Sequence, residues 1–218
     1  MLNSSSKVLL IGNSYEKSIY NKLPSHNDIE KMLEICNKLN IKDITVKKDV
    51  FLEETLKNFF KTVKKDENVF IYFSGHGGDL TGSKNLPEIG LLSSWINCDG
   101  SFYLSYYLDK FLSESKEVQG CNSVVIVSDS CYAGNFLKFY SPSSFSPKIM
   151  FIGASDIASR TLSYLRDGKK YGALCLLLEY LFTLEDDKRE INLDNIKEKT
   201  EKFRRENRFL RNMVCKNF

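Results

Sequence analysis

Five short runs of apolar and β-branched residues constrain the fold of this chain most. Each run has the length of a strand and is bounded by Gly, Asn, Asp or Ser. They are KVLLI (7–11), DITV (43–46), NVFIYF (68–73), SVVIV (123–127) and KIMFIG (148–153). Strands that are apolar on both faces are typical of a parallel sheet covered by helices on each side.

Segments with helical spacing of apolar residues lie between and after these runs. Three amphipathic stripes carry their apolar residues at Ile29, Met32, Leu33, Cys36 and Leu39, at Leu52, Leu56, Phe59 and Val63, and at Leu104, Leu108, Phe111 and Leu112. Residues 173–184 are apolar nearly all round, which predicts a buried helix, and a charged helix is expected over 193–209. The alternation predicts one α/β domain over 1–218, a three-layer sandwich with a mostly parallel central sheet flanked by helices.

Composition excludes several classes of function. The 31 basic and 28 acidic residues give a net charge of +3, too small a surplus to indicate a nucleic-acid partner. No run approaches the roughly 18 apolar residues of a membrane span, and the N-terminus does not resemble a secretion signal. The six cysteines contain no CxxC pair or metal-like spacing. We therefore expect a cytoplasmic protein with free thiols and no membrane partner.

Two long irregular stretches, 74–101 and 132–147, each begin where a predicted strand ends. Ligands bind at the carboxyl edge of open parallel sheets, so the residues that open these stretches are the first candidates for chemistry. They include His76, between two glycines, and Cys131, after the polar run 128–130, which we expect to leave the core of the strand. A lone cysteine is usually a small buried hydrophobe and a lone histidine is usually structural. A converging pair instead predicts a thiol nucleophile activated by an imidazole base.

The segments around these two residues carry a family resemblance. FIYFSGHGG and VVIVSDSCYAG resemble the dyad motifs of the caspase-like cysteine peptidases, and the metacaspases with their bacterial relatives more than animal caspases. The resemblance runs from about Lys7 to Leu184 through LLIGNSY, LPSHNDIEKMLEICNKL, FIGASDIASR and GALCLLLEYL. It implies a caspase-like fold and peptide-bond cleavage through a thioester. Cys131 would attack, His76 would transfer protons, and the backbone N–H groups of Gly77 and Cys131 would bind the oxyanion.

Charge near the nucleophile indicates the substrate. Animal caspases carry Gln two residues before the nucleophile, whereas this chain has Asp129, which favours a cationic side chain. The resemblance to metacaspases adds Asp28 and Ser74 to the same pocket. The expected partner is a polypeptide with Arg or Lys at the cleavage site. Asp28 has an alternative role, because Ser25-x-x-Asp28 is also similar to a helix capping box.

Other features limit this interpretation. The first long stretch holds only Asp79, Glu88 and Asp99 as acidic residues, and Lys138 follows the nucleophile. Calcium needs several oxygen ligands, so we expect no calcium requirement and no other cofactor. Like metacaspases, the protein is expected to be a monomer. The alternatives are a catalytically silent signalling adaptor on the same fold, and a nucleotide-binding domain, which the absence of a Gly-rich phosphate loop after the first strand disfavours.

Overall fold

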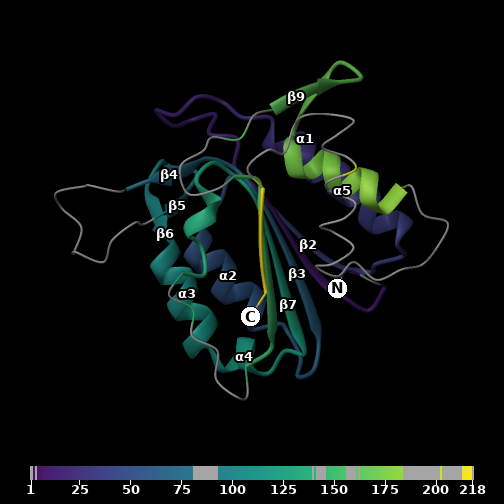
Figure 1. The fold of residues 1–218 in the computed structure, drawn as a ribbon, viewed down its shortest axis with the longest axis vertical. Helices are drawn as coiled ribbons and strands as arrows, with labels where there is room; N and C mark the ends of the chain where they lie inside the picture. Colours follow the sequence, from purple (N-terminus) through teal and green to yellow (C-terminus); the bar gives the residue numbers. More distant parts are fainter. Residues whose placement is uncertain are drawn as a thin grey trace.

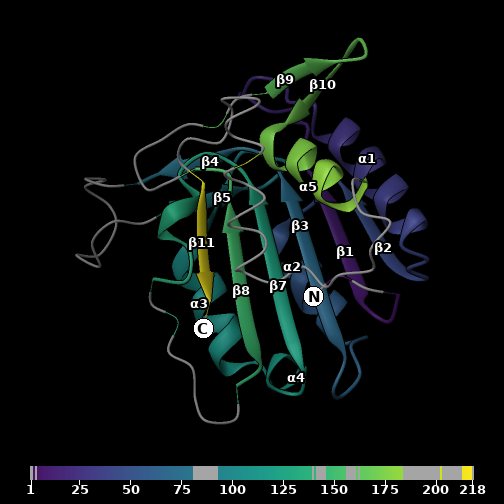
Figure 2. The ribbon, with the colours of Figure 1, turned by 45° about the vertical axis from the view of Figure 1, so that its right-hand side comes forward.

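The fold is built on a six-stranded sheet with the order β11-β8-β7-β3-β1-β2 (Figure 1 and Figure 2). The computed structural model describes residues 2, 4–80, 93–138, 140, 146–155, 161, 163–183, 202 and 213–217. The sheet strands are β1 (Lys7–Gly12), β2 (Asp43–Lys48), β3 (Asn68–Ser74), β7 (Ser123–Asp129), β8 (Lys148–Gly153) and β11 (Val214–Asn217). All neighbours are parallel except the pair β8 and β11. The five predicted runs are therefore confirmed as the parallel strands.

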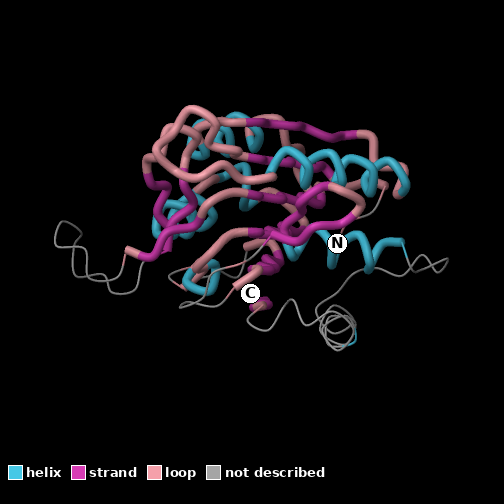
Figure 3. Tube along the Cα trace, turned by 90° about the horizontal axis from the view of Figure 1, so that it is seen from above, coloured by secondary structure: helices cyan, strands magenta, loops and turns pink. Residues whose placement is uncertain are grey.

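Helices cover both faces of this sheet, as the view from above shows (Figure 3). One face is covered by α1 (Ser25–Lys38) and α5 (Ala173–Thr183), and the other by α2 (Leu52–Phe60), α3 (Ser105–Glu114) and α4 (Lys116–Gln119). Consecutive residues of a strand point to opposite faces, so Tyr72 of β3 belongs to the core under α1 and α5, and its neighbour Phe73 to the other core. The predicted three-layer α/β class is confirmed. Of the helix expected over 193–209, the structure describes only residue 202.

Three local expectations are corrected. The strand β2 is not apolar on both faces, because it is the edge strand and solvent reaches most of its side chains. The helix α2 ends at Phe60, before Val63. The stretch 74–101 is not wholly irregular, since a small antiparallel sheet draws on it, made of β4 (Gly77–Asp79), β5 (Ser93–Ile96) and β6 (Phe102–Leu104).

The register of the large sheet fixes where the long stretches start. Ser74, the last residue of β3, is the direct neighbour of Asp129, the last residue of β7. A short 3₁₀ turn, η1 (Ala133–Asn135), follows β7. A hairpin of β9 (Ser163–Arg166) and β10 (Lys169–Gly172) rises above the same edge at the top of Figure 1 and leads into α5. The carboxyl edge is thus enclosed by segments from distant parts of the sequence.

Candidate active site

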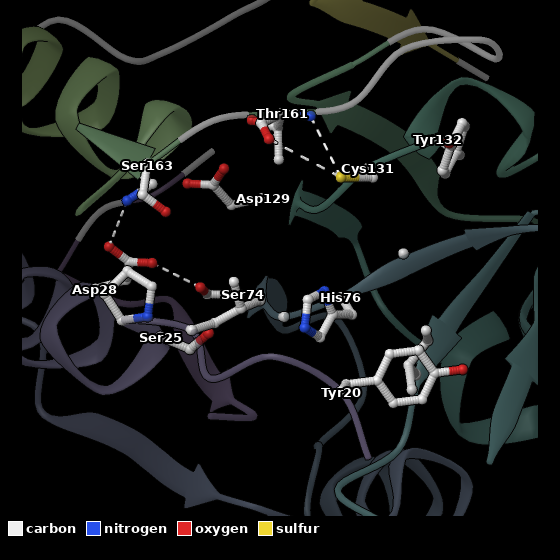
Figure 4. Close-up of a pocket in the computed structure, with 16 residues that line it drawn as sticks. Tyr20, Ser25, Asp28, Ser74, His76, Asp129, Cys131, Tyr132, Thr161 and Ser163 are labelled. Carbon is white, nitrogen blue, oxygen red and sulfur yellow. Dashed lines mark hydrogen bonds between the residues drawn. The ribbon is translucent and has the colours of Figure 1, made fainter. Parts of the chain in front are cut away.

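The predicted dyad lies at this carboxyl edge. His76 and Cys131 each follow, by two residues, one member of the register pair Ser74 and Asp129. Both line one cavity of about 340 Å³ together with Asp28, Ser74 and Asp129 (Figure 4). The structure therefore brings together in one cavity all five side chains that the sequence nominated. Asp28 comes from α1, Ser74 and Asp129 end the strands β3 and β7, and His76 and Cys131 lie in the segments that follow these strands.

The imidazole of His76 is held in one orientation. Its Nε2 lies 2.7 Å from the carbonyl oxygen of Asn21. A carbonyl only accepts hydrogen bonds, so Nε2 carries a proton and Nδ1 is the nitrogen that is free to act as a base in the neutral ring. Burial lowers the pKa of His76, although the Asn21 carbonyl opposes this effect. The neutral, proton-accepting form is therefore favoured near pH 7.

Cys131 lies two residues after the end of β7 and is only partly buried. The backbone N–H of Thr161 donates to its Sγ at 3.3 Å, a contact drawn in Figure 4. The polar run before it does not leave the core as we expected, since Ser128 and Ser130 are fully buried and their hydroxyls lie 2.8 Å apart. The indole N–H of Trp95 donates to Ser128 Oγ. These bonds satisfy the buried hydroxyls and brace the strand that presents the thiol.

Gly77 lies against the backbone of Cys131. A Cβ atom on Gly77 would stand 1.9 Å from the carbonyl oxygen of Cys131, so only glycine allows this approach. Gly77 of β4 pairs with Trp95 of β5. The neighbouring hydrogen bond between the two segments runs from Ile96 N–H to the carbonyl of His76. The predicted oxyanion donors thus come from two adjoining backbone segments.

The carboxylate of Asp28 faces the cavity. Its Oδ2 accepts from Ser74 Oγ at 2.6 Å, and its Oδ1 accepts from Gly172 N–H at 2.8 Å. The capping alternative is not borne out. Pro24 occupies the N-cap of α1, and no side chain among the described residues caps the start of this helix. Asp28 is 1% exposed, so its position is set by the tertiary contacts to β3 and β10.

Asp129 sits at the N-terminus of α5. Its Oδ2 accepts from Tyr72 Oη at 3.1 Å and from Cys175 N–H at 3.0 Å, while Oδ1 is buried without a hydrogen-bond partner among the described residues. The helix N-terminus favours a negative charge there. A Cβ on Gly172 would lie 2.2 Å from Asp129 Oδ2, so glycine at this position makes room for the carboxylate.

Burial, together with repulsion between the two carboxylates, makes ionisation of each of them less favourable. Burial, and then the charge of Asp129, raise the pKa of Asp28 to about 7. Burial raises the pKa of Asp129 to about 6, against the lowering effect of its hydrogen bonds from Cys175 and Tyr72. No lysine or arginine in the described part of the chain forms an ion pair with either carboxylate. The arrangement is that of an acidic cavity that a cation would stabilise.

The acidic residues considered for calcium do not cluster in the described structure. Within those residues no three His, Cys, Asp or Glu side chains are placed to hold a metal ion. Asp99 instead accepts hydrogen bonds from the backbone and hydroxyl of Ser101. Glu88 lies outside the described residues, so calcium independence stays a prediction.

The family of the chain follows from its sequence as a whole. The family model of the caspase domain matches residues 5–210. The chain belongs to the caspase domain family. This is a family of cysteine peptidases, as the resemblance around the dyad motifs predicted.

The fold of this caspase domain is similar to a solved structure. The crystal structure of protein GSU0716 from Geobacter sulfurreducens has a TM-score of 0.65 and 18% sequence identity, over 98% of this chain and 92% of that chain. This likeness concerns the fold alone. A comparison with curated proteins gave no match. Among the described helices of the caspase domain, none has the length and apolar character that crossing a membrane requires.

Several site residues were missed by the sequence interpretation. Asn21 contributes only its carbonyl and Thr161 only its N–H, and backbone groups of this kind leave no signal in side-chain patterns. Tyr15 packs on the ring of His76, with ring centroids 4.6 Å apart. Cys175 is a buried free cysteine of α5, and burial raises the pKa of its thiol. Its backbone N–H nevertheless orients Asp129.

Proposed function

We propose that this caspase domain is a cysteine endopeptidase that cleaves peptide bonds after arginine or lysine. The observation that carries the proposal is the single cavity that joins the paired carboxylates of Asp28 and Asp129 to Cys131 and His76. A cation held by the carboxylates would place the next carbonyl carbon of the same peptide near the thiol. The proposal assigns the protein to the metacaspase-like branch of its family.

In the proposed reaction, Nδ1 of His76 takes the proton of Cys131 and the thiolate attacks the carbonyl carbon of the substrate. The new S–C bond moves an electron pair onto the carbonyl oxygen, where the N–H groups of Gly77 and Cys131 would stabilise it. Collapse of this intermediate breaks the C–N bond, and the leaving amine takes the proton from His76. Water then hydrolyses the thioester, which releases the carboxylic acid and restores the thiol.

The specificity rests on charge and hydrogen bonding. The carboxylates of Asp129 and Asp28 offer acceptors that a guanidinium or ammonium group would fill, and Oδ1 of Asp129 has no hydrogen-bond partner among the described residues. Ser74 Oγ, which donates to Asp28, adds a further polar group at the same wall. Charge-assisted hydrogen bonds of this kind are about twice as strong as neutral ones. A substrate aspartate would meet repulsion in the same place.

The test is cleavage of fluorogenic peptides that differ only in ending with Arg, Lys, Asp or Met. We expect cleavage after Arg and Lys that persists with a chelator and disappears in Cys131→Ala and His76→Ala. Cys98→Ala is the matched control, because Cys98 is also a partly buried free thiol but does not line the cavity.

Each of the other possible results would contradict one part of the proposal. Cleavage after Asp alone would overturn the pocket assigned to Asp28 and Asp129. Dependence on calcium would overturn the expected metal independence. Failure to cleave any peptide would favour the silent or adaptor alternative.

A further inference from the structure

We infer that Tyr15 is the positioning residue of the dyad, and that its hydroxyl sets the place of His76 and Gly77 relative to Cys131. The inference rests on the proposed function of these residues. Tyr15 follows β1 and is 1% exposed, and it touches the site through its ring and its hydroxyl.

The backbone that carries Tyr15 is fixed in an unusual conformation. Its φ is +65°, a value that non-glycine residues rarely adopt and that surrounding contacts must maintain. On one side, Ser14 N–H and Oγ both donate to the carboxylate of Asp49, at 2.6 and 3.0 Å. Next to it, Asn13 Nδ2 lies 3.2 Å from the carbonyls of Val50 and Ile96. The turn after β1 is therefore tied to the end of β2 and to β5.

The hydroxyl of Tyr15 interrupts a backbone ladder. It accepts from His76 N–H at 2.9 Å and donates to the Ile96 carbonyl at 2.7 Å. By the register of β4 and β5, these two backbone groups would otherwise pair with each other, as Ile96 N–H and the His76 carbonyl do at 3.1 Å. The inserted hydroxyl separates the chains on one side of His76 only. It thereby sets the direction in which β4 starts and brings Gly77 against Cys131.

The ring of Tyr15 also confines the imidazole. Its centroid lies 4.6 Å from that of His76, and Tyr20 contacts the same imidazole with a centroid distance of 5.4 Å. Figure 4 shows Tyr20 beside His76 in the cavity. With Nε2 bonded to the Asn21 carbonyl, the imidazole has little freedom to turn. Burial raises the pKa of Tyr15, so the hydroxyl stays protonated and works as a neutral bridge.

The packing of Gly75, the residue before His76, supports the bridging role of the Tyr15 hydroxyl. A Cβ atom on Gly75 would lie 2.7 Å from Tyr15 Oη and 2.5 Å from the ring of Phe73. A side chain at this position would push the hydroxyl out of its bridge. Glycine is therefore needed at the two positions beside His76 for different reasons. Gly77 makes room for Cys131, and Gly75 makes room for Tyr15.

The decisive variant is Tyr15→Phe, which keeps the ring and removes the hydroxyl. We expect kcat on an arginine peptide to fall about 10- to 100-fold, because small misplacements of catalytic groups have effects of this size. KM should stay within about twofold, since the acidic pocket is untouched. Tyr103→Phe is the matched control, because it removes another buried phenolic hydroxyl that lies outside the cavity, and it should keep wild-type kinetics.

A second readout separates positioning from stability and from substrate choice. The rate of Cys131 alkylation by iodoacetamide, followed by mass spectrometry against pH, should differ between wild type and His76→Ala. Tyr15→Phe should move toward the His76→Ala profile, while a merely structural role would lower the melting temperature and leave the profile unchanged. The alkylation result stands even if the wild type cleaves none of the peptides, which would count against the proposed function alone.

The inference would be overturned if folded Tyr15→Phe kept the wild-type kcat and alkylation profile. If this variant does not fold, Gly75→Ala decides, because it displaces the hydroxyl while retaining Tyr15. Gly75→Ala should then show the same loss of kcat and the same change in profile, and wild-type values in that variant would refute the bridge.

Discussion

Replacing Asp28 with asparagine is expected to stabilise the protein above neutral pH while it weakens cleavage after arginine. An asparagine can keep both hydrogen bonds of the carboxylate, since its Oδ1 can accept from Gly172 N–H and its Nδ2 can donate to Ser74 Oγ. The change therefore removes a buried charge that faces Asp129 and leaves the shape of the pocket in place.

The magnitude follows from the pKa of Asp28. Its rise from 3.8 to about 7 in the folded protein means that ionisation of this carboxyl lowers the free energy of unfolding by at most about 4 kcal/mol. The folded form holds the proton longer than the unfolded form, so the loss begins near pH 4 and is complete above pH 7. Because the amide hydrogen bonds are weaker than those to a carboxylate, we expect Asp28→Asn to gain about 1–2 kcal/mol above pH 7.

The assay is urea unfolding of wild type and Asp28→Asn at pH 4 and pH 8, with arginine-peptide cleavage at pH 8. The stability gain should appear only at pH 8, while kcat/KM should fall at least about 30-fold through loss of a buried charge partner. Asp49→Asn is the control, and its effect on stability should have the opposite sign, because hydrogen bonds from Ser14 hold the pKa of Asp49 below its ordinary value. It should destabilise the protein at pH 8. A stability gain at pH 4, or none at pH 8, would refute the electrostatic reasoning.

Three further outcomes are expected. The kcat/KM for arginine peptides should fall as pH drops from 7 to 5, because the two pocket carboxyls have pKa values raised to about 7 and about 6, and a pH profile that stayed flat would contradict this. Gly172→Ala, whose Cβ would lie 2.2 Å from Asp129 Oδ2, should lower arginine-peptide cleavage about 10-fold or more while alkylation of Cys131 by iodoacetamide is unchanged. Lys216→Met should lower the free energy of unfolding by about 1–3 kcal/mol in a urea titration, because Lys216 Nζ donates to the carbonyls of Gly134 and Phe136 at 2.6 and 2.9 Å.

The sequence-based expectations that proved wrong concern properties that depend on neighbours in space. The polar run before Cys131 suggested a chain leaving the core, but Trp95 and a second serine satisfy its hydroxyls inside the core. The Ser25-x-x-Asp28 spacing allowed a capping role, and the structure instead turns Asp28 toward Ser74 and Gly172. Local spacing sets which bonds are possible, whereas packing determines which of them form.

The sequence by itself determined the layers and the position of the dyad. Short apolar runs that alternate with helical segments predicted the parallel sheet, and His76 and Cys131 each lie two residues after one of its strands. Only the tertiary structure decided that Tyr15 bridges β4 and β5, that the Asn21 carbonyl fixes the imidazole, and that Gly172 makes room for Asp129. These contacts join residues far apart in the chain, often through backbone atoms that every residue possesses. No pattern of side chains encodes them, and they arise when the strands come into register at one edge of the sheet.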